Sequence, residues 1–164
     1  MHVTNRLEEH ALTVVLQHSR SLELNRIFYG GRISNAQMVA LADYQLAHPD
    51  WLAYDVFNLI APGADFSPIR TEDLDAIVAK YTTIFAPRDL LIFRRSAWIN
   101  RSPAAQAQLD HWIARRNTRK EQTLDARQFE SVPEAANWLV LTADKAPLLE
   151  TGEGFEELAR YDQL

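Results

Sequence analysis

The sequence predicts a single α/β domain: a mixed sheet of about five strands packed by about four helices. The prediction rests on the alternation of two kinds of segment and on the order of elements that this alternation gives. Short runs rich in β-branched and aromatic residues alternate with longer segments whose apolar residues recur at helical spacing. The resulting order is ββαβαβαβα, and such alternation is typical of a largely parallel sheet with crossover helices.

The first two strands are predicted within "ALTVVLQHSRSLELNRIFYGGRIS", residues 11–34. Residues 14–16 form a short apolar run, "HSRS" reads as a turn, and residues 22–28 resume β-type side chains. Ser34 then offers an N-cap for a helix over "AQMVALADYQLAH". Pro49 is expected to end that helix, because the residue before a proline avoids the helical region.

The centre of the sheet is predicted at "WLAYDVFNLIA", residues 51–61. This run is apolar at nearly every position, which is typical of a strand buried on both faces. Asp55 and Asn58 interrupt it and lie three residues apart, so we expect them on opposite faces of the sheet. Both are therefore expected to be hydrogen-bonded structural groups and not an acid–base pair.

The second half of the domain continues the alternation. A helical stripe runs through "RTEDLDAIVAKYTTIF", and "DLLIF", residues 89–93, reads as a short buried strand. Ser102 and Pro103 fit the start of the next helix. "QTLDARQF" reads as a weaker strand, and Ser131 with Glu134 predicts a capping box for the last helix. The predicted core includes Val56, Phe57, Leu59, Ile77, Val78, Ile92, Leu109, Ile113 and Leu139.

Charge is distributed unevenly along the chain. We expect one domain over residues 1–141 and a loosely held acidic tail over residues 142–164, with a short helix at 154–163. The basic run "HWIARRNTRK", residues 111–120, reads as a solvated helix end, where the macrodipole favours cations. The alternative is an anion-binding patch that the acidic tail covers.

Composition excludes several classes of protein. The chain has no cysteine, so disulfides and thiolate metal sites are excluded, and a reducing cytoplasm fits this usage. No apolar run approaches the ~20 residues that span a bilayer, and the first residues lack the apolar core of a signal peptide. The net charge of −5 argues against nucleic acid as a partner. A cytoplasmic protein without a membrane span is expected.

Motifs of known chemistry are missing from the sequence. There is no G-x-S-x-G elbow, no phosphate-binding or dinucleotide-binding glycine loop and no H-E-x-x-H. The five histidines are scattered without the spacing of metal ligands. We therefore expect no catalytic residues, no cofactor and no metal.

Three stretches resemble a known family: "LNRIFYGGRIS", "YDVFNLIA" and "RQFESVPEAANWL". They are similar to the second strand, the central strand and the closing strand and helix of the STAS domain (sulfate transporter and anti-sigma-factor antagonist) and its SpoIIAA-like relatives. The resemblance runs from about Thr13 to Leu141. It implies a SpoIIAA-like fold and places the chain near the small bacterial STAS-like proteins of unassigned role.

The resemblance also implies a regulatory loop. In anti-sigma-factor antagonists, a partner kinase phosphorylates a serine in the loop after the central strand, usually within Asp-Ser-Ser-Gly. This chain has Asp65-Phe66-Ser67-Pro68 at the matching place, so Asp65, Phe66 and Ser67 are candidate regulatory or contact residues. From the residues alone, Ser67 and Pro68 also fit the N-cap and first position of the following helix.

A second candidate site lies in "FRRSAWINRSP". Arg95, Arg101 and Ser102 are predicted near the end of a strand and the start of a helix, where anionic ligands of parallel sheets often bind. They are therefore candidate anion-binding residues.

Three classes of function stay open. The first is a non-enzymatic regulatory or protein-interaction module in signalling, with a protein partner. The second is a small-molecule or lipid-binding domain, because the topology also resembles the CRAL-TRIO lipid-transfer domain. An uncharacterised enzyme is the third. A homodimer is expected, because Phe28, Tyr29, Tyr44 and Trp51 are more aromatic surface than a small monomer needs to expose.

Overall fold

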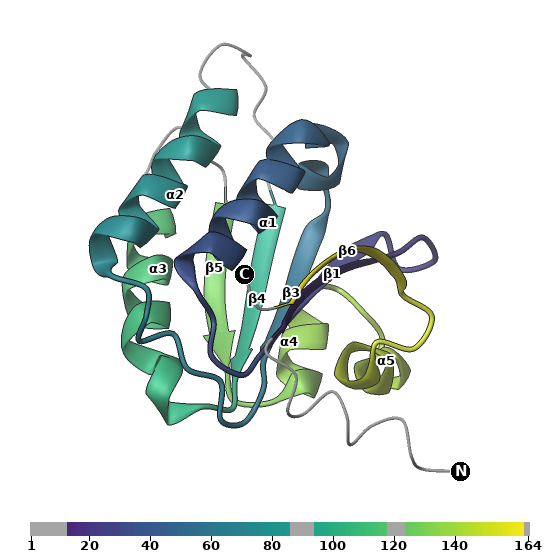
Figure 1. Ribbon diagram of the computed structural model, residues 1–164. Helices are drawn as coiled ribbons and strands as arrows, with labels where there is room; N and C mark the ends of the chain where they lie inside the picture. The colour runs from purple at the N-terminus through teal and green to yellow at the C-terminus, as the bar shows by residue number, and fades with distance from the viewer. Residues whose placement is uncertain (1–12, 86–93, 118–123, 163–164) are drawn as a thin grey trace.

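A computed structural model describes residues 13–85, 94–117 and 124–162 of the chain (Figure 1). Its centre is a six-stranded mixed sheet with the order β5-β4-β3-β2-β1-β6. The strands are β1 Thr13–Ser19, β2 Leu24–Gly30, β3 Asp55–Ile60, β4 Arg94–Asn100, β5 Leu124–Phe129 and β6 Glu156–Tyr161. The predicted α/β class is confirmed, with one strand more than expected.

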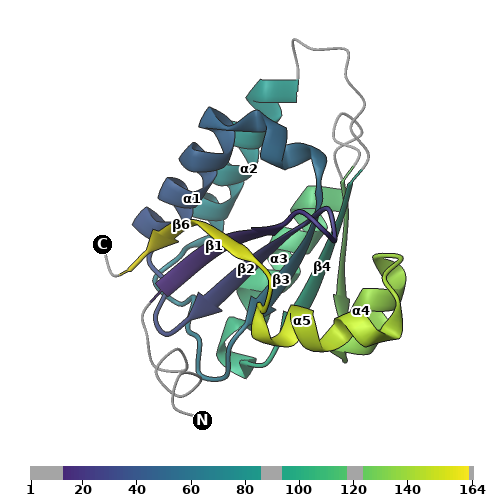
Figure 2. The same ribbon diagram turned by 90° about the vertical axis from the view of Figure 1, so that its right-hand side faces the viewer.

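The sheet is covered on both faces. The described residues form five α-helices: α1 Asn35–Ala47, α2 Thr71–Phe85, α3 Gln106–Asn117, α4 Val132–Trp138 and α5 Ala146–Thr151. Helices α1, α2 and α3 cover one face, and α4 and α5 lie on the other (Figures 1 and 2). Short 3₁₀ turns precede β3, α3 and α5, at Pro49–Ala53, Pro103–Ala105 and Ala143–Lys145.

Strand direction follows from the connections. β2, β3, β4 and β5 are parallel neighbours, and a helix lies between each consecutive pair along the chain. β1 pairs antiparallel with β2 on one side and with β6 on the other. β3 therefore lies inside the sheet, as its nearly continuous apolar sequence predicts.

Local signals fix two of the helix starts. The Ser34 side chain accepts from the Gln37 N–H, and the Gln37 side chain accepts in return from the Ser34 N–H, which completes a capping box. Ser131 accepts from the Glu134 N–H at the start of α4. The predicted N-cap at Ser34 is confirmed, and so is Ser131 as an N-cap, but only the Ser131 half of the capping box expected with Glu134 is present.

Two apolar clusters lie on the two faces of the sheet. The one under α1–α3 includes Ile27, Ile77 and Leu109, and the one under α4–α5 includes Phe57, Leu59 and Leu139. Of the predicted core, the residues that are buried are Val56, Phe57, Leu59, Ile77, Val78, Leu109 and Leu139. Ile113 is only partly buried, and Ile92 lies outside the described residues.

The position of β4 differs from the prediction. The expected strand "DLLIF", residues 89–93, lies outside the described residues, and the observed strand covers Arg94–Asn100. Arg94 and Arg95 therefore begin a strand. The sequence pattern predicts them near the end of one.

The expected short helix at 154–163 is wrong. Residues Glu156–Tyr161 form β6, which pairs with β1 through a register shift between Leu16 and Gln17. Without β6, β1 would present a row of unpaired backbone groups at the edge of the sheet. The acidic segment is thus part of the sheet, with Leu158 and Tyr161 packed against the core.

The aromatic residues behind the expected homodimer are not exposed. Tyr29 is buried, and Phe28, Tyr44 and Trp51 are half-buried. They pack within the domain, so this reason for self-association is lost. Among the described helices, none is both long and apolar enough to cross a bilayer.

Candidate functional site

Arg95, Arg101 and Ser102 do not form a common site. Arg95 lies near the start of β4, whereas Arg101 and Ser102 follow its end, about 20 Å along the strand. Arg101 pairs with Glu150, and the Ser102 hydroxyl donates to the Ala64 carbonyl. Each of these polar groups is already engaged within the fold.

The Asp65-Phe66-Ser67 loop is a structured connector. The Ser67 N–H and hydroxyl both donate to the Asp65 carboxylate, at 2.8 and 2.9 Å, and these bonds lower the pKa of Asp65. Phe66 is buried, with its ring 5.7 Å from that of Tyr29. The alternative in which Ser67 caps the next helix is wrong, because α2 begins at Thr71.

Hydrogen bonds around Arg70 explain why α2 begins at Thr71 and not directly after Ser67. The Asp73 carboxylate accepts from the Arg70 N–H at 3.0 Å, and the Leu74 N–H donates to the Arg70 carbonyl at 3.2 Å. Arg70 therefore holds the capping position, three residues after Ser67.

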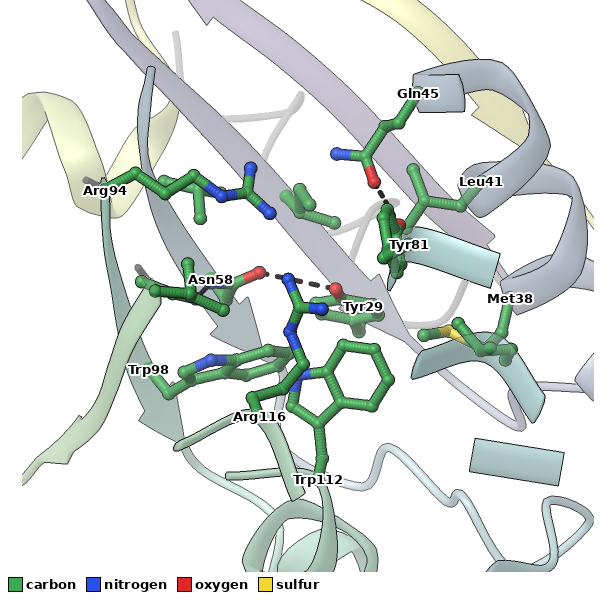
Figure 3. Close-up of a pocket in the computed structure, with 15 residues that line it drawn as sticks. Tyr29, Met38, Leu41, Gln45, Asn58, Tyr81, Arg94, Trp98, Trp112 and Arg116 are labelled. Atoms are coloured by element: carbon green, nitrogen blue, oxygen red, sulfur yellow. Dashed lines mark hydrogen bonds between the residues drawn. The ribbon is translucent and has the colours of Figure 1, made fainter. Parts of the chain in front are cut away.

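A cavity of about 40 Å³ with several polar side chains in its lining lies between the sheet and helices α1–α3. Figure 3 shows the side chains of Arg94, from β4, and Arg116, from the last turn of α3, extending into this space. Arg94 is 8% exposed and Arg116 is 2% exposed. Lysine and arginine are almost never this buried without a compensating group, so the cavity is unusual.

Arg94 has a buried charge that the described residues do not neutralise. Its Nη1 atom is buried and has no hydrogen-bond partner among them. The carboxylate of Asp55 is near enough to favour the charged form, but it lies across the sheet and is held by Arg95 at 2.7 Å. Burial lowers the pKa of Arg94, yet a guanidinium starts so high that it stays charged at neutral pH.

Arg116 is held by aromatic rings. Its guanidinium carbon lies 4.9 Å from the ring centre of Tyr81 and 5.4 Å from that of Trp112. These are cation–π distances, and the attraction is strongest where water is excluded. The rings fix the Arg116 side chain in the wall of the cavity.

Neutral donors complete the lining. The Trp98 Nε1 atom is buried without a hydrogen-bond partner among the described residues. The Tyr29 hydroxyl donates to Asn58 at 3.3 Å, and the Tyr81 hydroxyl donates to Gln45. Burial raises the pKa of both tyrosines, which keeps their hydroxyls protonated at neutral pH.

The described residues that line the cavity include neither a carboxylate nor a histidine. Two guanidinium groups and an unpartnered indole N–H therefore lie in the lining of one small cavity. Such a set of donors suits an anion, because charge-assisted hydrogen bonds are shorter and stronger than neutral ones. The same set supplies no general base for acid–base chemistry.

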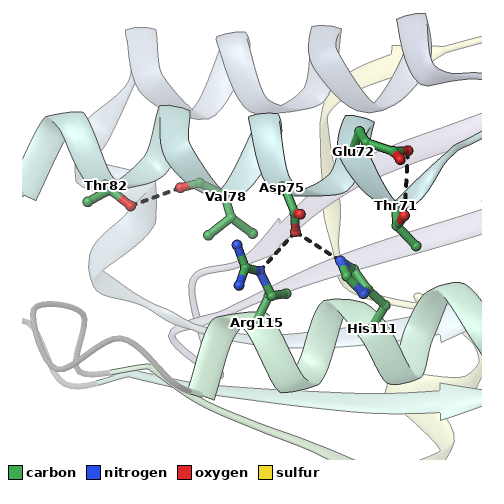
Figure 4. A network of polar contacts seen from close by, with 7 residues as sticks. All are labelled: Thr71, Glu72, Asp75, Val78, Thr82, His111 and Arg115. Carbon is green, nitrogen blue, oxygen red and sulfur yellow. Dashed lines mark hydrogen bonds and ion pairs between the residues drawn. The ribbon is translucent and has the colours of Figure 1, made fainter.

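Arg115, next to Arg116 in the sequence, lies on the outer side of α3 and is paired with a carboxylate. Arg115 and His111 both donate to the Asp75 carboxylate of α2, each at 2.9 Å (Figure 4). These bonds lower the pKa of Asp75. Within the basic run 111–120, Arg115 thus joins two helices at the surface, whereas the adjacent Arg116 turns into the cavity.

Sequence reasoning missed this cavity for two reasons. The sequence predicts the strand at residues 89–93, so Arg94 and Arg95 are expected near its end. In addition, the basic run was expected to be solvated or covered by the acidic tail. The expected tail instead contains α5 and β6, and β6 lies beyond β1 at the opposite edge of the sheet from β5. A usable signal was the helical spacing of Trp112 and Arg116.

Among the described residues, no three His, Cys, Asp or Glu side chains gather in a way that could hold a metal ion. No family model, curated protein or solved structure matches this chain.

Proposed function

We propose that this protein is a non-enzymatic binding module that takes up a small anion in the cavity beneath α1–α3. The observation that carries the proposal is Arg94, whose buried Nη1 has no hydrogen-bond partner among the described residues. An ion taken from water loses its hydration energy, and an uncompensated buried charge is costly. A bound anion would supply the missing counter-charge.

The ends of the covering helices help to keep the arginines charged. Gln45, Tyr81 and Arg116 lie in the carboxyl-terminal halves of α1, α2 and α3, where the helix dipole is negative and favours cations. This supports a permanently cationic cavity. The helix dipoles do not replace a bound anion as the counter-charge of Arg94, because helix ends carry only a partial negative charge.

A regulatory switch at Ser67, which the STAS-like resemblance implies, is less well supported. A phosphate on Ser67 would lie beside the Asp65 carboxylate that now accepts the Ser67 hydrogen bonds. Like-charge repulsion would then oppose the modified state. In the role proposed here, a protein partner instead distinguishes the protein with an anion in the cavity from the protein without one.

The proposal is tested by titrating the ¹⁵N-labelled protein with sodium acetate at constant ionic strength. The reporter is the indole N–H signal of Trp98, assigned by its loss in Trp98→Phe. We expect a saturable shift of this signal in the wild type and none in Arg94→Met. Arg115→Met is the matched control, because it removes the same charge from the outer face of α3, and it should bind like the wild type.

Stability gives a second test that separates binding from a structural role. Arg94→Met removes an unpaired buried charge, so the ligand-free variant should be at least as stable as the wild type. A stabilised variant that no longer binds acetate supports the proposal. An unchanged Trp98 signal in the wild type, or equal shifts in wild type and Arg94→Met, would overturn it.

A further inference from the structure

Ser96 lies on β4 between Arg94 and Trp98 and faces the same cavity. Side chains of a strand alternate between its two faces, so residues 94, 96 and 98 point to the same side of the sheet. All three line the cavity under α1–α3, and Ser96 is buried. Its hydroxyl therefore lies in one row with Arg94 Nη1 and Trp98 Nε1, the two donors that have no hydrogen-bond partner among the described residues.

The side-chain amide of Asn58, on the neighbouring strand β3, has a fixed orientation. Its nitrogen lies 3.2 Å from the carbonyl oxygen of Ala97, which can only accept a hydrogen bond. Its oxygen accepts from the Tyr29 hydroxyl (Figure 3), which burial keeps protonated by raising its pKa. Turning the amide round would set its oxygen against the Ala97 carbonyl, so the nitrogen stays on the side of β4.

This orientation decides what the Ser96 hydroxyl does. Asn58 Nδ2 donates to Ser96 Oγ at 3.1 Å, so Ser96 is the acceptor in this bond. A hydroxyl also has one proton to donate, and buried polar groups are normally hydrogen-bonded. No acceptor for that proton is found among the described residues. The hydrogen bonds thus run in one direction, from Tyr29 through Asn58 to Ser96, and leave a donor at the cavity.

We infer that Ser96 is a ligand-binding residue of the anion site: its hydroxyl donates to the bound anion, and the Asn58 amide holds it in this donor orientation. The inference rests on the proposed anion-binding function and narrows its ligand to a small, fully deprotonated carboxylate. A carboxylate has about four acceptor sites and no proton to place. It therefore has enough acceptor sites for the donors of Arg94, Ser96 and Trp98 together.

The volume of the cavity restricts this ligand to a compact one. A volume of about 40 Å³ holds about three or four water-sized groups, at about 10–15 Å³ for each group. Formate has three non-hydrogen atoms and acetate has four, so formate lies well within this limit and acetate reaches it. Sodium formate is therefore the probe for the experiment.

Ser96→Ala tests the inference, because it removes the hydroxyl and leaves Arg94 and Trp98 in place. A hydrogen bond to a charged group contributes more than a neutral one, so Ser96→Ala should bind formate about ten- to hundredfold more weakly than the wild type. The Trp98 indole titration at constant ionic strength measures this difference. Ser19→Ala is the matched control, because it removes a buried hydroxyl that accepts from the Leu22 N–H outside the cavity. It should bind like the wild type.

The side-chain amide signal of Asn58 gives a readout that a merely structural role of Ser96 would not move. When the Ser96 hydroxyl donates to an anion, its oxygen becomes a stronger acceptor, because hydrogen bonds in a chain polarise one another. The Asn58 Nδ2–H signal should therefore move downfield as formate saturates the wild type. It should move much less when formate saturates Ser96→Ala. The wild-type part of this measurement needs no variant, so it decides the matter even if Ser96→Ala folds poorly.

The outcomes separate the role of Ser96 from the anion site itself. Formate binding by Ser96→Ala with the affinity of the wild type would overturn the role of Ser96 and leave the anion site standing. An Asn58 signal that stays in place while the Trp98 signal of the wild type shifts would have the same meaning. Failure of both signals to respond to formate and to acetate in the wild type would overturn both proposals.

Discussion

Arg94 and Arg95 are adjacent in β4, but their side chains lie on opposite faces of the sheet. Arg94 extends into the cavity under α1–α3. Arg95 donates to the Asp55 carboxylate from its backbone N–H and from its guanidinium, and it also donates to the Trp138 carbonyl of α4. The alternation of a strand thus separates a paired arginine from one whose Nη1 has no hydrogen-bond partner among the described residues.

The ion pair of Asp55 and Arg95 should be a structural link between β3, β4 and α4. Both side chains are about three-quarters buried. Replacing Arg95 by Met leaves the carboxylate with too few donors, and we expect a loss of about 1–3 kcal/mol in the free energy of unfolding, measured by urea denaturation.

A double-mutant cycle checks this expectation. Asp55→Asn combined with Arg95→Met should cost less than the sum of the two single changes, because the partners interact. Strict additivity would show that the pair contributes nothing.

Val140 should be a site where glycine stabilises the protein. It follows α4 with a φ of 62°, and the Leu141 N–H donates to the Ala136 carbonyl at 2.9 Å, which is the Schellman arrangement. A β-branched residue is strained in this left-handed region, and the Val140 side chain is 77% exposed.

We expect Val140→Gly to raise the free energy of unfolding by about 0.5–1 kcal/mol, after allowance for the greater freedom of glycine in the unfolded chain. Thermal unfolding measures this as a rise of a few degrees in Tm. A lower Tm would mean that the Val140 side chain makes a stabilising contact.

Gly152 should be less replaceable than Gly154, although both have positive φ, 75° and 80°. A Cβ on Gly152 would lie 3.0 Å from Nη1 of Arg26, whereas one on Gly154 would meet nothing within 4 Å. Arg26 is buried and donates to the Leu149 carbonyl at 2.8 Å, so it cannot move without losing that bond.

Gly154→Ala should therefore cost only the left-handed strain, about 1–2 kcal/mol. Gly152→Ala should cost about 1 kcal/mol more, as hydrogen bonds of Arg26 weaken. Chemical denaturation of the two variants makes the comparison, and equal losses would show that Arg26 adjusts freely.

Stability in acid should depend in part on Asp75. Its pKa in the folded protein is lowered by the hydrogen bond from His111 and by Arg115. Because the folded pKa lies below the unfolded one, this contribution is present above the unfolded pKa, about 3.9. It is lost as the pH falls through the folded pKa.

The difference in Tm between the wild type and Asp75→Asn should thus be largest at about pH 5 and shrink toward about pH 2. Glu153→Gln removes an exposed carboxylate outside this network and serves as the control. A difference in Tm that stays constant with pH would show that Asp75 does not contribute to the pH dependence of stability.

Elements with local signals could be predicted from the sequence. The apolar run of β3, the stripe of Leu74, Ile77 and Val78 on α2, and the caps at Ser34 and Ser131 follow from side-chain period and from hydrogen bonds three residues apart. These features together were sufficient for the α/β class. They also placed Asp55 and Asn58 on opposite faces.

The conformation of the C-terminal segment and the surroundings of the buried arginines depend on long-range packing and could not be predicted from the sequence. Residues 156–161 have little strand signal of their own, and they become β6 because β1 offers unpaired backbone groups at the sheet edge. Arg94 and Arg116 come from elements that are separate in sequence and meet only when α3 packs against the sheet. The burial of Arg94 depends on this long-range packing and has no local period, so the spacing of residues cannot reveal it.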